Sequence, residues 1–350
     1  MPIRVLVVDD SLFMRTLISD LLNADPDVSV IGTAQSGVEA LKQLPKLKPD
    51  VITLDLAMPG VDGLTTLERL MAEHPTPVII LSAHSKEDAA VTLQGLHVGA
   101  VGYVLKPSGE LSLDIHTVRT QLLEAVKAAA TVNVKALKAL AAKPPRRPRR
   151  RISGVRRLLV IGASTGGPQT LEAILPLLPA DFPAPILVVQ HAPSRWFTET
   201  LAQRLHQQCA LPVKVAEEAE AIRAGTVYLA PSGSRMTLRR EQTTEAVIEL
   251  QPEESQELSP SIDLTMQSVA QVYQDAAVGI VLSGMGHDGV KGMKAIKDAG
   301  GRTIVQDASA LIFGMPKAVI DHGLADQVLP ASEIADAMVE IIATKVESSK

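Results

Sequence analysis

A serine stands at the centre of a glycine-rich turn in the second half of the chain. Residues 158–170 read LLVIGASTGGPQT, in which Gly162, Ser164 and Gly166 match the pattern G-x-S-x-G. Where an apolar strand turns sharply into a helix, this pattern exposes a serine hydroxyl for nucleophilic attack. Glycines ahead of a helix can instead cradle a phosphate with backbone N–H groups, although the segment lacks the G-K-[ST] ending of a P-loop. The motif alone favours a nucleophile and leaves phosphate binding open.

A serine hydroxyl needs a general base, and the base needs an acid that orients it. His191 ends the apolar segment PILVVQH, and Asp288 lies just beyond the apolar segment AVGIVLSG. Side chains at the carboxyl ends of parallel strands converge at one edge of a sheet. His287 and Asp307 are rival candidates, but the glycines around Asp288 favour it because they leave backbone amides open to an oxyanion. The order Ser, His, Asp differs from that of the α/β-hydrolase fold, which disfavours a lipase-like enzyme.

A second group of chemistry-bearing residues lies in the first half, again at predicted strand ends. Its members are Asp9, Asp10, Asp55, Ser82 and Lys106. Carboxylates gathered in one crevice repel each other and favour a hard divalent cation, for which Mg²⁺ is the usual choice. Any one of these residues alone could simply cap the helix that follows.

Short apolar segments that alternate with helical patterns must position both groups. In the first half, strands are predicted at 4–9, 28–34, 50–55, 77–83 and 102–107. In the second half, they are predicted at 155–164, 185–191, 213–216, 225–231, 246–250, 276–284 and 302–307, with a β-hairpin around 226–250. Such alternation indicates parallel sheets covered by helices on both faces. We therefore predict an α/β protein with two doubly wound domains.

The bulk composition is that of a globular protein with two cores. The chain has 350 residues, 46% hydrophobic and 21% charged, and a net charge of −5, which argues weakly against nucleic acid as the main ligand. Aromatic residues make up 2%, so aliphatic side chains and methionine must fill the cores. The single cysteine, Cys209, cannot form an intramolecular disulfide, and no segment has the length of an apolar membrane span. These features predict a cytoplasmic protein.

The motifs of the first half resemble the receiver domain of two-component response regulators. The resemblance rests on VVDD, LDLAMPGVDG, ILSAH and VLKP, at the spacing found here over about 120 residues. It implies a flavodoxin-like fold in which Asp55 accepts a phosphoryl group. It also implies that Asp10, Asp55 and the Ala57 carbonyl hold Mg²⁺ with Asp9 close by, and that Ser82 and Lys106 contact the phosphoryl oxygens.

The motifs of the second half resemble the catalytic domain of the chemotaxis protein-glutamate methylesterases. They are IGASTGGPQTL, VQHAP, YLAPSG, SPSIDLTMQSVA, LSGMGHDGVKGM and QDASALIFGMPKAV. The resemblance implies that Ser164 is the nucleophile, His191 the base and Asp288 the orienting acid. It further implies that Thr165 supports the histidine and that the Met285 amide helps to form an oxyanion hole, with no cofactor in this domain.

Together the resemblances imply a receiver domain over 1–125 and a methylesterase domain over 156–346. Between them, the composition shifts to Ala and Lys and then to Pro and Arg, which predicts a basic linker over 126–155. The expected function is phosphorylation-regulated removal of methyl groups from glutamate γ-methyl esters of chemoreceptors during chemotaxis adaptation, with glutamine deamidation by the same route. Expected partners are methyl-accepting chemoreceptors and a chemotaxis histidine kinase that donates phosphate, with no nucleic acid and no membrane insertion. The alternative is a non-catalytic response regulator whose second domain binds a partner or a nucleotide.

Overall fold

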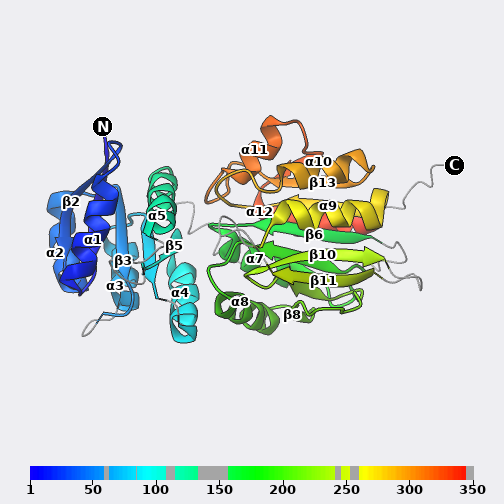
Figure 1. The fold of residues 1–350 in the computed structure, drawn as a ribbon, viewed down its shortest axis with the longest axis horizontal. Coiled ribbons are helices and arrows are strands. Elements are labelled where there is room, and N and C mark those ends of the chain that lie inside the picture. The colour runs from blue at the N-terminus through cyan, green and yellow to red at the C-terminus, as the bar shows by residue number, and fades with distance from the viewer. Residues whose placement is uncertain are drawn as a thin grey trace. The chain divides into compact units, whose positions relative to one another are not determined.

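The chain folds into two compact units, Met1–Ala139 and Leu140–Lys350 (Figure 1). The computed structural model describes residues 1–58, 63–83, 85–107, 115–132, 157–240, 246–252 and 260–343. Most of the predicted linker, from residue 133 on, therefore lies outside the described residues. The domain boundaries at 125, 155 and 346 stay predictions.

The first unit is built on a five-stranded parallel sheet. Its strands are β1 (Ile3–Val8), β2 (Val28–Ala34), β3 (Val51–Asp55), β4 (Val78–Ser82) and β5 (Gly102–Leu105), in the order β2-β1-β3-β4-β5. Its helices are α1 (Leu12–Asn23), α2 (Gly37–Leu47), α3 (Gly63–Glu73), α4 (Lys86–Val98) and α5 (Ile115–Ala129). α1 packs against α5, whereas α3 packs against both α2 and α4, so helices cover both faces. All five predicted strands are present.

The second unit contains a seven-stranded parallel sheet in the order β14-β13-β12-β6-β7-β9-β8. The strands are β6 (Leu158–Ala163), β7 (Ile186–Gln190), β8 (Val213–Val215), β9 (Val227–Leu229), β12 (Ala277–Val281), β13 (Arg302–Gln306) and β14 (Gln327–Leu329). The helices are α7 (Gly167–Ile174), α8 (Arg195–Gln208), α9 (Ile262–Tyr273), α10 (Val290–Asp298), α11 (Met315–Asp321) and α12 (Ala331–Ala343). The predicted fold class, two α/β units with parallel sheets, is confirmed.

A two-stranded antiparallel hairpin adds to the second unit. It pairs β10 (Ser234–Arg240) with β11 (Ala246–Pro252). The hairpin was predicted around 226–250, but β9 at its start belongs to the large sheet. All three β9 residues are buried, as in a parallel strand covered on both faces, whereas β10 buries Met236 and Leu238 and exposes Arg239 and Arg240.

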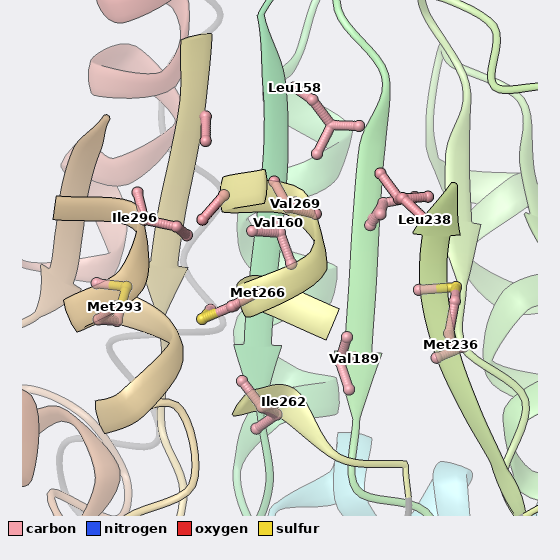
Figure 2. Close-up of a cluster of buried hydrophobic side chains, with 14 of the residues drawn as sticks. Leu158, Val160, Val189, Met236, Leu238, Ile262, Met266, Val269, Met293 and Ile296 are labelled. Atoms are coloured by element: carbon pink, nitrogen blue, oxygen red, sulfur yellow. The ribbon is translucent and has the colours of Figure 1, made fainter. Parts of the chain in front are cut away.

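Helix α9 packs against both β6 of the large sheet and β10 of the hairpin (Figure 2). From α9, Met266 and Val269 belong to one buried cluster with Val160 of β6, Met236 of β10 and Met293 of α10. Aliphatic and methionine side chains make up most of this core, as the low aromatic content predicts.

The strand order of each sheet places a topological switch point next to its polar residues. In the first unit, β1 lies between β2 and β3. In the second unit, the chain runs from β6 to β7 on one side and later returns to β12 on the other side of β6. In open α/β sheets, ligands bind outside the carboxyl ends of strands at such points.

Candidate functional sites

Ser164 follows the last residue of β6 and lies in the turn that leads to α7. Gly166 makes this turn with a φ of +81°, and Gly167 begins the helix. Among the described residues other than glycine, positive φ occurs at Lys48, Ala219 and Gln274 only, so Ser164 itself is not in the left-handed region. The turn therefore differs from a strained nucleophile elbow, because a glycine adopts the unusual conformation.

Gln190, which the sequence analysis did not single out, holds the backbone on both sides of this turn. Its Nε2 donates to the carbonyl of Ser164 at 2.9 Å and to the carbonyl of His191 at 2.8 Å. The side chain is only 3% exposed, and a Cβ on Gly167 would lie 2.0 Å from its Oε1. A glutamine that ends an otherwise apolar, buried strand is the signal that could have identified it.

His191 and Asp288 form a direct pair. The Nε2 atom of His191 lies 2.9 Å from Oδ2 of Asp288, and both side chains are buried. The His191 backbone N–H donates to the carbonyl of Ala163 at 3.0 Å, which places the histidine beside Ser164. The rivals do not share this arrangement: His287 is exposed, and Asp307 accepts from the amide of Ser309.

Asp288 is held as a carboxylate by the groups around it. Its oxygens accept the backbone N–H groups of Ile262 at 2.8 Å, Asp263 at 2.9 Å and Gly289 at 3.0 Å. Burial alone would raise the pKa of Asp288, but the hydrogen bond and the charge of His191 and the amides of Ile262 and Asp263 outweigh it, so the pKa lies below its ordinary value. The pair can therefore stabilise an imidazolium that forms when the histidine accepts a proton.

Ser283, a second residue that the sequence analysis missed, holds the backbone of Ser164 and Thr165 in the turn. Its carbonyl accepts the N–H of Ser164 at 3.0 Å, and its hydroxyl donates to the carbonyl of Thr165 at 2.8 Å. Gly284, which precedes Met285, approaches so closely that a Cβ there would lie 2.8 Å from the Cβ of Ser164. Thr165 thus lies within the nucleophile turn, and Met285 follows the glycine that packs against Ser164, while their supporting and oxyanion roles stay predictions.

The first unit brings the predicted acidic residues together around Lys106. The Nζ atom of Lys106 lies 2.7 Å from Oδ2 of Asp9 and 2.7 Å from Oδ2 of Asp55. One carboxylate oxygen from each of Asp9, Asp10 and Asp55 lies within 4.8 Å of the other two. These residues form an acidic pocket.

The other predicted residues adjoin this acidic pocket. The backbone N–H of Ala57 donates to Asp55 Oδ1 at 2.9 Å, and the hydroxyl of Ser82 pairs with that of Thr92 at 2.8 Å. The metal role of the Ala57 carbonyl stays a prediction.

Comparisons with known proteins follow the division into two units. A family model described as CheB methylesterase matches residues 159–338, and one described as response regulator receiver domain matches residues 5–116. The protein-glutamate methylesterase/protein-glutamine glutaminase of Symbiobacterium thermophilum is 43% identical over 356 residues, which cover 97% of this chain and 97% of that protein. The chain belongs to the CheB methylesterase family.

Other CheB relatives agree. The protein-glutamate methylesterase/protein-glutamine glutaminase of Thermotoga maritima is 40% identical and covers 97% of this chain and 98% of its own length. The crystal structure of the Thermotoga maritima CheB methylesterase catalytic domain is 40% identical, with a TM-score of 0.52, and covers 54% of this chain and 100% of that one. Both resemblances inferred from the motifs are thereby confirmed.

The acidic pocket of this CheB receiver fits a hard divalent cation. Burial raises the pKa of Asp9, although the hydrogen bond and the charge of Lys106 oppose this shift. Burial alone would lower the pKa of Lys106, but the hydrogen bonds to Asp55 and Asp9 raise it. One lysine thus offsets only part of the negative charge of three carboxylates. Oxygen ligands with surplus negative charge are what Mg²⁺ requires.

Among the described helices of this CheB chain, none combines the length and the apolar character needed to cross a membrane.

Proposed function

We propose that the second unit hydrolyses γ-methyl esters of glutamate side chains in methyl-accepting chemoreceptors, and that it deamidates receptor glutamines by the same route. The observation that carries the proposal is the buried contact between His191 and Asp288 beside the turn of Ser164. The names of the full-length relatives, protein-glutamate methylesterase/protein-glutamine glutaminase, support the choice of substrates.

The reaction proceeds in two acyl-transfer steps. The hydroxyl of Ser164 attacks the γ-carbonyl carbon, and His191 takes its proton; because Nε2 faces Asp288, the proton goes to Nδ1. The tetrahedral oxyanion accepts a hydrogen bond from the Met285 amide, and its collapse breaks the ester bond while His191 returns the proton to the leaving methoxide, which departs as methanol. Water then attacks the acyl-enzyme, with His191 again as the base, and releases glutamate and Ser164. A glutamine substrate releases ammonia in place of methanol.

The first unit accepts a phosphoryl group on Asp55 from a chemotaxis histidine kinase and thereby regulates the hydrolase. Asp10, Asp55 and the Ala57 carbonyl would hold Mg²⁺, which supplies positive charge for the transferred phosphoryl group. Lys106 and Ser82 would contact the phosphoryl oxygens; Lys106 already lies 2.7 Å from Asp55. A phosphoaspartate adds about two negative charges, so Lys106 must exchange part of its pairing with Asp9 and Asp55 for the phosphate.

The test is methanol release from receptor membranes that carry methylated glutamates. We expect Ser164→Ala to reduce the rate by about 10⁴-fold or more, because removal of a triad member leaves only the remaining binding and oxyanion interactions. Ser332→Ala, which changes an exposed serine on α12, provides the matched control and should retain the wild-type rate. Methanol release that Ser164→Ala leaves unchanged would contradict the nucleophile, and no release from the wild type would favour the non-catalytic alternative.

A further inference from the structure

Two helices of the second unit begin at the carboxylate that contacts His191. Asp288, just ahead of α10, accepts the backbone N–H groups of Ile262 and Asp263, the first two residues of α9. In return, Oδ1 of Asp263 accepts the N–H of Gly289 at 2.9 Å and that of Gly292 at 2.7 Å, at the beginning of α10. Asp288, which precedes α10, therefore caps α9. Asp263, which belongs to α9, caps α10.

Helix α10 depends on this cap from outside because its own N-cap residue is Gly289. A side-chain N-cap normally accepts the N–H two or three residues further on, and Gly289 has no side chain to do so. Glycine is required there by a φ of +102° and by the nearby methyl groups of Val281 and Ile262, 3.2 and 3.3 Å from a Cβ. Asp263 thus takes the place of the N-cap side chain that position 289 cannot carry.

The same hydrogen bonds determine where Asp288 can point. The N–H of Gly289 lies 2.9 Å from Oδ1 of Asp263 and 3.0 Å from Oδ1 of Asp288, so one amide joins the two carboxylates. Oδ1 of Asp288 is thereby directed toward the helix termini, and Oδ2 remains for His191 and the Ile262 amide. Without the Asp263 carboxylate, the N–H of Gly292 would lose this side-chain acceptor and the N–H of Gly289 would keep only Oδ1 of Asp288, so the turn that carries Asp288 would be held less firmly.

We infer that Asp263 is a positioning residue of the hydrolase: through the amides of Gly289 and Gly292 it fixes the turn that aims Asp288 at His191. Asp263 acts on the reaction through Asp288, with which it shares the Gly289 amide. The inference rests on the proposed function, since it assigns Asp263 a part in the Ser164 reaction. It gives a physical reason for Asp263 in the motif SPSIDLTMQSVA.

Steady-state kinetics of the full-length protein with methylated receptor membranes and with a small ester test this inference. We expect Asp263→Ala to lower kcat at least tenfold on both substrates with KM changed less than threefold, because small displacements of catalytic groups are costly. Asp263→Asn keeps an Oδ1 acceptor for both amides and should recover kcat to within about threefold of the wild type. Asp298→Ala, at the opposite end of α10, is the matched control and should leave kcat unchanged.

Thermal unfolding curves ensure that every variant is assayed well below its melting transition. Should Asp263→Ala fail to fold, Asp263→Glu decides, because it keeps the charge but moves the acceptor by one methylene and should lower kcat like alanine. The inference is overturned if folded Asp263→Ala or Asp263→Glu retains kcat within twofold, if the loss lies in KM, or if Asp263→Asn is as slow as Asp263→Ala. Failure of the proposed function would be separate, since Ser164→Ala would then leave the rate unchanged.

Discussion

At the scale of single residues, the carboxylate of Asp288 combines a catalytic contact with structural ones. It contacts the His191 ring and accepts three backbone amides, and this combination holds its pKa below the ordinary value. Substitutions at this position should therefore affect both activity and folding.

The lowered pKa of Asp288 predicts a pH-dependent contribution to stability. The folded state favours the ionised form, so the contribution is complete at pH values above the ordinary pKa of 3.8 and is lost as the pH falls through the lower folded value. We expect Asp288→Asn to reduce the free energy of unfolding at pH 7 and to reduce it progressively less as the pH falls below about 4. Urea unfolding between pH 7 and the acid transition measures this difference; a gap that stays constant with pH would contradict the assigned pKa direction.

Gly284 predicts a steric effect on the nucleophile. A Cβ at this position would lie 2.4 Å from Sδ of Met315, 2.8 Å from Cβ of Ser164 and 3.1 Å from its backbone nitrogen. The Ser164 backbone would have to move, so Gly284→Ala should lower kcat by about 100-fold and the free energy of unfolding by about 1–3 kcal/mol. The measurements are ester hydrolysis and chemical denaturation.

Gly323→Ala is the control for the cost of losing a glycine. Gly323 has a φ of +67° with nothing within 4 Å of a Cβ, so alanine there should cost about 1–2 kcal/mol of stability and leave kcat unchanged. Wild-type activity in Gly284→Ala would show that the turn of Ser164 tolerates displacement.

At the scale of the elements, the apolar strands were predictable because both sheets are parallel and buried. Strands such as β3, β4, β6 and β7 are buried over their whole length, and they appear in the sequence as short continuous apolar segments. β14 gave no such signal and was not predicted, since two of its three residues are exposed at the edge of the sheet. β9 was assigned to the hairpin because a strand of three residues carries too little pattern to reveal its partner.

The site was predictable only where side chains act at strand ends. Ser164, His191 and Asp288 follow β6, β7 and β12, whose neighbouring places in the sheet bring them together. Gln190 and Ser283 were missed because they act on backbone carbonyls and amides, which leave no spacing pattern in a sequence. The same is true of Asp263, whose partners become neighbours only when α9 packs against α10.

At the scale of the whole molecule, Asp55 and Ser164 lie in different units. Phosphorylation of Asp55 can change the rate at Ser164 only if a signal passes from one unit to the other. We expect a small-molecule phosphodonor to raise the ester hydrolysis rate of the full-length protein by about 5- to 150-fold, the range of typical coupling free energies. Asp55→Asn or removal of Mg²⁺ by a chelator should abolish this increase and leave the basal rate intact. A fragment that begins at Arg156 should not respond to the phosphodonor at all. Equal rates with and without phosphodonor in the full-length protein would contradict regulation through Asp55.

The scarcity of aromatic residues has a spectroscopic consequence. The chain contains one tryptophan, Trp196, which lies in the first turn of α8, five positions after His191, and is 44% exposed. Intrinsic tryptophan emission therefore arises entirely from the second unit, close in sequence to the base, and contains no contribution from the receiver. An experimenter can follow ligand binding or unfolding of the hydrolase in the intact protein without attaching a dye, and titration of the receiver with metal will change that signal only if the two units communicate.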